Sequence, residues 1–107
     1  MYDNLIANLK ELHTKDNHLE IINLILEIPK ANLTYEVVGL LSRAYNNTDE
    51  FDKAIECLMS ISDQGKNDSV WNYRLGHSYF YKDEFENALA HFEKSYQLGD
   101  SESLEYV

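Results

Sequence analysis

Cysteine, proline and glycine are scarce in this chain of 107 residues, which has one cysteine, one proline and four glycines. The single cysteine, Cys57, excludes a framework of disulfide bonds within the chain. The low proline and glycine content, together with 44% hydrophobic residues, argues against a disordered chain and against a turn-rich all-β architecture. The composition therefore predicts a helical protein.

Basic residues are also few, because 9 lysines and arginines stand against 19 acids and give a formal net charge of -10. This charge opposes binding to nucleic-acid phosphates or to anionic lipid. The longest nearly apolar run, residues 19–28, includes two glutamates, and a membrane span needs about 20 apolar residues. The N-terminal residues lack the basic and apolar regions of a secretory signal. We therefore expect a cytoplasmic protein with no nucleic-acid or membrane partner.

Two segments of the chain repeat each other, because residues 40–58 align with residues 74–92 when the sequence is compared with itself. Each segment contains two stretches of helical periodicity, joined by a turn around the shared sequence DEF. The aligned residues include Tyr45 with Tyr79, Ala54 with Ala88, and Leu58 with Phe92. Asp49 and Asp83, at the end of the turns, are predicted to cap the N-termini of the second helices.

Gly76 lies inside the first predicted helix of the second segment, where a glycine costs about 1 kcal/mol relative to alanine. We expect it to serve packing, because a small residue facing Ala88 on the second helix lets the two backbones approach closely. Large aromatic residues would then fill the wider space on either side, namely Tyr79, Phe85 and Phe92.

This arrangement over residues 34–98 resembles two consecutive repeats of the tetratricopeptide family, which has a period of about 34 residues. The signature positions are occupied by Leu75, Gly76, Tyr79, Phe85, Ala88 and Phe92. One departure is Trp71, which precedes Leu75 by four residues where the family has three. The resemblance implies an all-α fold, a right-handed α-α superhelix, or solenoid, of about three helix–turn–helix repeats.

The N-terminal segment is predicted to be a degenerate repeat that caps the array. Its apolar residues are Leu5, Leu9 and Leu12 before a turn, then Leu19, Ile22, Ile25 and Ile28, with Pro29 closing the helix. At the other end, residues 100–107 predict a short C-terminal helix whose Leu104 packs on the last repeat. We expect one domain over residues 1–107, with repeats at 1–31, 32–65 and 66–99 and a partial helix at 100–107.

Catalytic constellations and phosphate-binding glycine loops are absent from the sequence. His91 and Cys57 are one repeat length apart and occupy equivalent places on adjacent second helices. Two such side chains do not make a zinc site, which needs three or four protein ligands. We therefore expect no enzymatic activity, no cofactor and no metal.

The family resemblance implies a concave groove, lined by the first helices, that receives a peptide or a partner helix. The residues that would face this groove are Leu40, Arg43, Asn46, Asn47, Tyr73, Arg74, His77, Phe80 and Tyr81. Arg43 and Arg74 are the only arginines of this acidic chain. Guanidinium groups suit carboxylates, asparagines bond a peptide backbone in both directions, and aromatic rings supply rigid contact area. This pattern favours a non-enzymatic scaffold that binds an acidic or C-terminal segment of a partner protein.

Three alternatives remain at this stage. The two arginines could instead pair with acids of the chain itself, such as Glu36, Asp52 or Asp68. The chain could form a homo-oligomer through an apolar end that includes Tyr96, Leu104 and Tyr106. It could also be the interaction domain of a larger regulatory protein.

Overall fold

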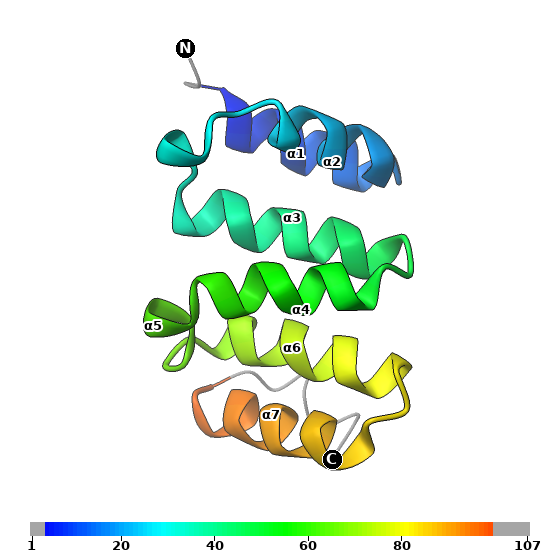
Figure 1. The fold of residues 1–107 in the computed structure, drawn as a ribbon, viewed down its shortest axis with the longest axis vertical. Helices are drawn as coiled ribbons and strands as arrows, with labels where there is room; N and C mark the ends of the chain where they lie inside the picture. Colours follow the sequence, from blue (N-terminus) through cyan, green and yellow to red (C-terminus); the bar gives the residue numbers. More distant parts are fainter. Residues whose placement is uncertain (1–3, 100–107) are drawn as a thin grey trace.

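The computed structural model describes residues 4–99, which form seven α-helices and one short 3-10 helix, with no strand in that range (Figure 1). The helices are α1 (Leu5–Thr14), α2 (His18–Leu26), η1 (Lys30–Asn32), α3 (Tyr35–Asn47), α4 (Phe51–Ser60), α5 (Ser62–Gly65), α6 (Ser69–Tyr81) and α7 (Phe85–Gln97). The predicted all-α fold class is confirmed. The expected helix at residues 100–107, with Leu104, lies outside the described residues.

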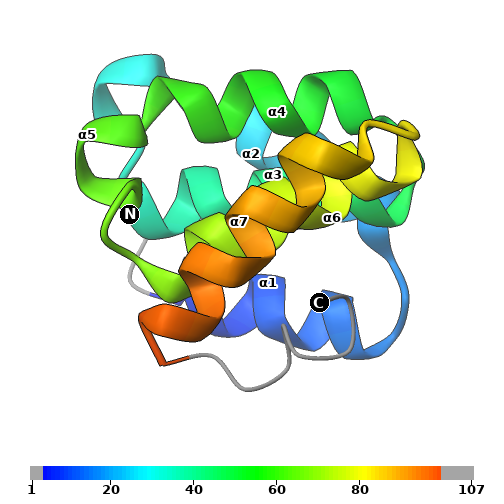
Figure 2. The same cartoon turned by 90° about the horizontal axis from the view of Figure 1, so that it is seen from below.

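Three helix pairs stack in chain order along the molecule (Figure 1). Within the pairs, α1 packs on α2, α3 on α4, and α6 on α7. Between the pairs, α3 packs on α2, and α6 packs on both α4 and α3. Viewed along the stack, α2 and α4 lie on one side and α1 on the opposite side, with α3 and α6 between them (Figure 2). The first helices α1, α3 and α6 thus lie away from the outer side formed by α2 and α4 (Figure 2).

A left-handed aspartate ends the first helix of every pair, with φ of 58° at Asp16, 62° at Asp49 and 65° at Asp83. The residue after each aspartate donates its N–H to the carbonyl five positions back, at 2.9 Å in all three turns. These bonds join Asn17 to Leu12, Glu50 to Tyr45, and Glu84 to Tyr79. This pattern is the Schellman motif, in which glycine is usual and a short polar residue is tolerated.

The prediction that Asp49 and Asp83 are N-caps is therefore wrong. The capping positions of α4 and α7 are Glu50 and Glu84, and neither makes a side-chain capping bond. An N-cap residue usually has an extended backbone, whereas both aspartates are left-handed. The aspartates end the preceding helices instead of starting the following ones.

Side-chain caps occur instead at the start of two first helices. Thr34 Oγ1 accepts the backbone N–H of Val37 at 3.2 Å, at the start of α3. Asp68 Oδ1 accepts the backbone N–H of Val70 at 3.1 Å, at the start of α6. Each bond satisfies an N–H that the helix leaves unpaired in its first turn. These caps stabilise the residues at which α3 and α6 begin.

The buried apolar residues form two clusters along the stack. The larger one joins α1, α2, α3 and α4, and its most buried members include Leu9, Ile21, Ile25 and Ala54. The other contains Leu58, Trp71 and Leu75 from α4 and α6. Trp71 Nε1 donates to the carbonyl of Leu58 at 2.7 Å, and its ring lies against Gly65 of α5. Trp71 therefore ties α5 and α6 to α4.

Gly76 serves packing as predicted, but its nearest neighbour differs from the predicted one. A Cβ on Gly76 would stand 2.7 Å from Cδ1 of Phe92, a residue of α7 that is 1% exposed. The absent side chain of Gly76 therefore leaves room for the Phe92 ring. Phe85, expected to fill the same space, is 55% exposed and contacts Phe80 with ring centroids 5.5 Å apart.

Candidate binding site between α1, α3 and α6

Two adjoining hollows lie where α1, α3 and α6 meet, with volumes of about 380 Å³ and about 330 Å³. Three residues line both of them, namely Arg43 of α3 and Val70 and Arg74 of α6. The structure therefore brings the two arginines of the chain to the same place. We call the two spaces the larger hollow and the smaller hollow.

The larger hollow is lined by charged residues of both signs, and each of its acids contacts another side chain. Glu36 pairs with Lys10 of α1 at 4.0 Å across an exposed edge. The hydroxyl of Tyr35 donates to Asp68 Oδ2 at 2.6 Å, while the other oxygen of Asp68 caps α6. Burial, together with this hydrogen bond, raises the pKa of Tyr35 above its ordinary value.

The smaller hollow has no acidic residue in its lining, as far as residues 4–99 are concerned. The residues around it are His13, Arg43, Asn46, Asn47, Val70, Tyr73, Arg74 and His77. Two cations and two imidazoles thus gather around one space in a chain of formal charge -10. Such a concentration of positive charge creates a local potential that attracts anions.

Neither guanidinium forms an ion pair or hydrogen bond with a side chain or carbonyl among residues 4–99. The acids considered as internal partners contact other groups: Glu36 lies 4.0 Å from Lys10, Asp52 pairs with Lys82, and Asp68 accepts from Tyr35. Burial lowers the pKa of Arg43, while burial and the charge of Arg43 lower the pKa of Arg74 to about 10. The charges of Asp68 and Glu36 nevertheless act on Arg74 and partly offset the lowering of its pKa. The environment therefore disfavours both charges, and a ligand anion would relieve this.

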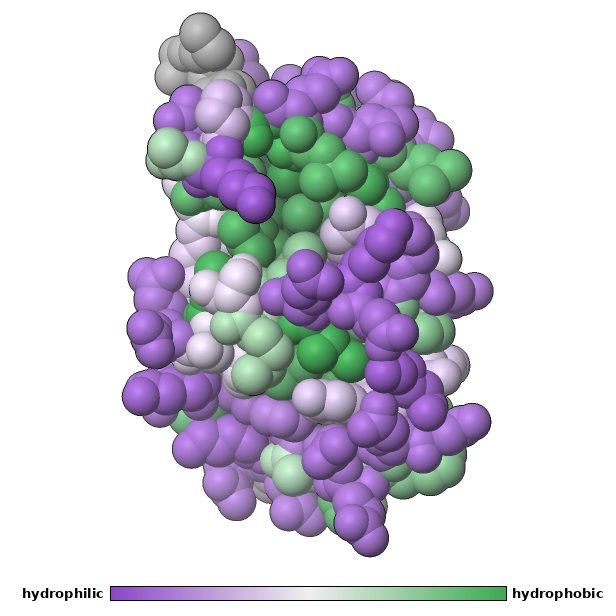
Figure 3. All heavy atoms as spheres, viewed as in Figure 1, coloured by the Kyte–Doolittle hydropathy of each residue, from purple (hydrophilic) through white to green (hydrophobic). Residues whose placement is uncertain are grey.

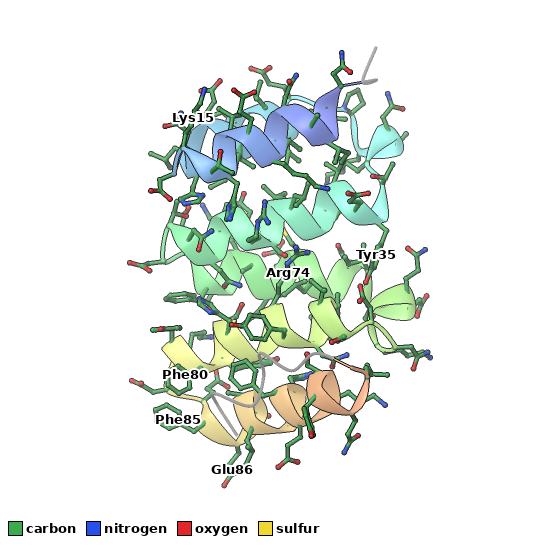
Figure 4. All side chains as sticks on the ribbon, turned by 180° about the vertical axis from the view of Figure 1, so that it is seen from behind. Lys15, Tyr35, Arg74, Phe80, Phe85 and Glu86 are labelled. Carbon is green, nitrogen blue, oxygen red and sulfur yellow. The ribbon has the colours of Figure 1, made fainter. Side chains whose placement is uncertain are left out.

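Gly39, in the middle of α3, makes room for the side chain of Arg74. A Cβ on Gly39 would stand 2.7 Å from Nη1 of Arg74. Figure 4 shows Arg74 between the ribbons of α3 and α6. A glycine inside a helix costs about 1 kcal/mol relative to alanine. The glycine thus lowers the helix stability at the point where it leaves room for a guanidinium that has no ion-pair partner among residues 4–99.

Asn46 connects α3 to α6 through hydrogen bonds of its side chain. Its Nδ2 donates to the backbone carbonyl of Arg74 at 3.2 Å, and its Oδ1 accepts from Ser78 Oγ at 2.7 Å. The residue is only 6% exposed. Asn46 therefore orients the turn of α6 that carries Arg74, and its expected hydrogen bonds to a peptide backbone would compete with this role.

The remaining predicted site residues divide into those at the hollows and those beyond them. Asn47, Tyr73 and His77 line the smaller hollow, and Leu40 contributes to the larger one although it is buried in the core. Phe80 and Tyr81 line neither. Figure 4 shows Phe80 beside Phe85, away from Arg74. Tyr81 stacks on the ring of Phe51 at 5.6 Å and contacts the ring of His77 at 4.7 Å.

The contribution of α1 is not predicted from the sequence, which indicates only a capping role for the first repeat. Lys10 lines the larger hollow and His13 the smaller one. A signal was present in the sequence, since Lys10, Arg43 and His77 follow one another at intervals of one repeat length. Basic or imidazole side chains thus occupy the same position in all three first helices.

Burial favours the neutral form of the two histidines of the smaller hollow. Nδ1 of His13 is buried with no hydrogen-bond partner among the described residues. Burial and the nearby charge of Arg43 lower the pKa of His13, with His18 and Arg74 acting in the same direction. Burial also lowers the pKa of His77, partly offset by Asp49. Both rings can supply one N–H donor while neutral.

The opposite face of the stack is apolar over α2 and the adjoining part of α4, and hydrophilic toward α7 (Figure 3). A hollow of about 380 Å³ lies there, lined by residues that include Ile25, Leu41, Tyr45 and Cys57. Burial raises the pKa of the Cys57 thiol to about 11. The thiol is therefore a poor nucleophile at neutral pH, since the thiolate is the reactive form.

His91 makes a different contact from the one suggested by its spacing from Cys57. Its Nδ1 lies 3.0 Å from Asn72 Oδ1, and its ring stacks on Tyr79 with centroids 5.7 Å apart. In the part of the chain that the structure describes, no group of three or more His, Cys, Asp or Glu side chains is placed to hold a metal ion.

Comparison with known protein families and structures gave one match. The family model for the tetratricopeptide repeat matches residues 35–61 and 72–100, which together exceed half of the 107 residues. The first range contains the pair α3–α4, and the second covers most of α6 and all of α7. No curated protein and no solved structure matches the chain significantly. Each helix within residues 4–99 is too short or too polar to cross a membrane.

Proposed function

Since this chain belongs to the tetratricopeptide repeat family, whose repeats are generally protein–protein interaction modules, we propose that it binds an acidic segment of a partner protein. The segment lies across the two hollows between α1, α3 and α6, with a carboxylate on Arg43 and Arg74. The protein acts as a scaffold rather than as an enzyme, as is typical of the family.

The observation that carries this proposal is the pair of guanidinium groups without an internal partner among the described residues. Arg43 and Arg74 line both hollows, and the two acids of the larger hollow contact Lys10 and Tyr35 and form no ion pair with either arginine. A desolvated charge is costly unless it is paired and hydrogen-bonded. Guanidinium groups bind carboxylates through two parallel N–H···O bonds, which gives both affinity and orientation.

The lining also fits the remainder of a peptide. Tyr35, Val70 and Trp71 provide apolar and aromatic surface in the larger hollow, beside the two arginines. Asn47 lies exposed at the edge of the smaller hollow, and its amide can both donate to and accept from a peptide backbone. An acidic segment with apolar neighbours therefore finds both kinds of contact in one place.

Peptide binding by fluorescence anisotropy tests this function. Labelled peptide pools of equal length, rich in Glu and Asp, in Ser and Gly, or in Lys, are titrated with the protein. We expect the acidic pool to bind best, and the double variant Arg43→Glu with Arg74→Glu to weaken that binding at least tenfold. A matched control reverses the same number of charges at two exposed lysines, Lys66→Glu with Lys94→Glu.

Two outcomes would contradict the proposal. One is equal binding of the acidic and neutral pools to the unaltered protein. The other is a double arginine variant that folds normally by circular dichroism and keeps its affinity for the acidic pool, while the lysine control behaves identically. Light scattering on the same samples tests the self-association alternative, for which Tyr96 is 49% exposed whereas Leu104 and Tyr106 lie outside the described residues.

A further inference from the structure

We propose that the smaller hollow is a phosphoryl-binding site, so that the partner segment carries a phosphorylated side chain whose oxygens meet Arg43, Arg74, His13 and His77. This inference rests on the proposed function and specifies the class of segment that is bound. It is argued from the charge balance of the hollow, from the donors around it and from one buried atom without a partner among the described residues.

The charge balance favours an anion with two negative charges. Arg43 and Arg74 both line the smaller hollow, and the charge of Arg43 lowers the pKa of Arg74. A single carboxylate would bring one negative charge to two guanidinium groups. The charges of Asp68 and Glu36 in the larger hollow also act on Arg74, whereas burial alone shifts the pKa of Arg43. A phosphorylated side chain carries a charge of about -1.5 to -2 at pH 7 and therefore offsets both.

The donors around the hollow exceed what one carboxylate can accept. Each guanidinium presents five N–H groups in a fixed fork, each histidine adds a ring nitrogen, and Asn47 adds an amide. A carboxylate has two oxygens, whereas a phosphoryl group has three strong acceptor oxygens. No acid of the described chain lines this hollow, whereas Glu36 and Asp68 line the larger one and would repel a dianion there. The phosphoryl group is thus assigned to the smaller hollow.

His13 supplies an independent indication of a missing partner. It lines the smaller hollow, and its Nδ1 is buried with no hydrogen bond among the described residues. Nδ1 of His18, whose ring lies 5.4 Å from that of His13 but outside the lining, is also without a partner in this range. A buried polar atom without a partner costs about 1–3 kcal/mol. A phosphoryl oxygen in the hollow provides an acceptor for an N–H of the His13 ring. The volume of about 330 Å³ lies within the range of about 300–1,000 Å³ found for small-ligand pockets.

Three matched peptide pools test the inference by fluorescence anisotropy at about 0.15 M salt, where remote surface charges are screened. The pools differ only at their centre, which is phosphoserine, serine, or a pair of glutamates with the same total charge. We expect the phosphoserine pool to bind at least tenfold more tightly than the glutamate pool. Millimolar inorganic phosphate and inorganic sulfate should both compete with it, since each is an anion whose oxygens can accept from these donors.

Variants identify the hollow as the site. Arg43→Gln and Arg74→Gln should each remove most of the preference for phosphoserine, and His13→Phe should reduce it severalfold. Lys94→Gln, which removes an exposed charge elsewhere, serves as the control and should leave the preference unchanged. Circular dichroism and thermal unfolding of each variant show whether the fold is kept, and His13→Gln replaces His13→Phe if the latter unfolds.

The outcomes separate this inference from the proposed function. Equal affinity for the phosphoserine and glutamate pools, lost in the arginine variants, would overturn the phosphoryl site and leave acidic-segment binding intact. A phosphoserine preference that survives in folded Arg43→Gln and Arg74→Gln proteins would also overturn it. Failure of every anionic pool to bind more tightly than the serine pool would remove the proposed function together with the inference.

Discussion

A Cβ on Gly39 would stand 2.7 Å from Nη1 of Arg74, the same distance that separates a Cβ on Gly76 from Cδ1 of Phe92. The two close approaches have different consequences. The guanidinium is the far end of a flexible side chain beside a hollow, so it can move away. The Phe92 ring is enclosed and cannot. Alanine at the two positions should therefore separate a binding role from a packing role.

Gly39→Ala is expected to leave the protein as stable as before, or to stabilise it by up to about 1 kcal/mol, because alanine is the better helix former. The new methyl group should displace the guanidinium of Arg74 and weaken binding of the acidic pool severalfold. Urea unfolding followed by the fluorescence of Trp71, the single tryptophan, gives the free energy of unfolding. Unchanged affinity would show that the position of the Arg74 guanidinium beside Gly39 does not matter for binding.

Gly76→Ala is expected to destabilise the protein by about 1–3 kcal/mol despite the better helix propensity of alanine, because overpacking a filled core costs this much. The Phe92 ring would have to move or the helices α6 and α7 to separate. The same urea titration measures the effect. A Gly76→Ala protein as stable as the unaltered one would mean that the space between α6 and α7 adapts easily.

Ser78→Ala should destabilise the protein by about 1–3 kcal/mol, because it leaves the buried Oδ1 of Asn46 without its donor. Ser60 is the matched control: its hydroxyl also donates a hydrogen bond, to the Cys57 carbonyl at 2.6 Å, but at an exposed position where water can replace it. We expect Ser60→Ala to change the free energy of unfolding by less than about 0.5 kcal/mol. Equal effects of the two substitutions would argue against the Asn46 connection between α3 and α6.

Alkylation of Cys57 by iodoacetamide should be slow in the folded protein. Burial raises the pKa of this thiol from 9.0 to about 11, which lowers the thiolate fraction at pH 8 by about 100-fold. The rate is measured by mass spectrometry, with the protein in concentrated urea as the reference. Folded and unfolded chains that react at the same rate would contradict a buried thiol in the apolar hollow.

Stability should fall as the pH is lowered below about 6.5. Burial lowers the pKa of His77 and of His91 in the folded state. At a pH below about 6.5 the unfolded chain therefore binds more protons than the folded chain, which favours unfolding. The stabilising contribution is thus fully present above the ordinary histidine pKa of 6.5 and is lost as the pH falls. Thermal unfolding between pH 7.5 and 5.5 measures it, and His91→Gln should flatten the decline. An unchanged melting temperature across this range would contradict the prediction.

The helix pairs could be predicted from the sequence, because the repeat places Tyr45 on Tyr79 and small residues on small ones. The turn geometry could not. Aspartate is favoured both at N-caps and, more than most residues, in the left-handed conformation, so residue type alone did not decide the role of Asp49. The hydrogen bond from the Glu50 N–H to the Tyr45 carbonyl shows that Asp49 ends α3, and this bond is known only from the structure.

The charged residues of the candidate site could be predicted from the sequence. The contacts that its residues make between repeats could not. Arg43 and Arg74 stand out as the only arginines of an acidic chain, and the repeat spacing places both on first helices. The hydrogen bonds of Asn46 to Arg74 and Ser78 cross from one pair to the next. The sequence does not show how α3 is aligned against α6. From the sequence alone, the amide of Asn46 is therefore expected to face a ligand.

The shared geometry of the three turns bears on how this chain can change in length. Asp16, Asp49 and Asp83 make the same bend at intervals of one repeat length, so each hairpin enters and leaves the stack in an equivalent way. In-frame duplication of the segment from Thr34 to Asn67 would insert a complete hairpin, with its own cap and bend, between existing ones. Adding a whole repeat therefore requires no new type of turn between helices. An added repeat would also bring another copy of Arg43.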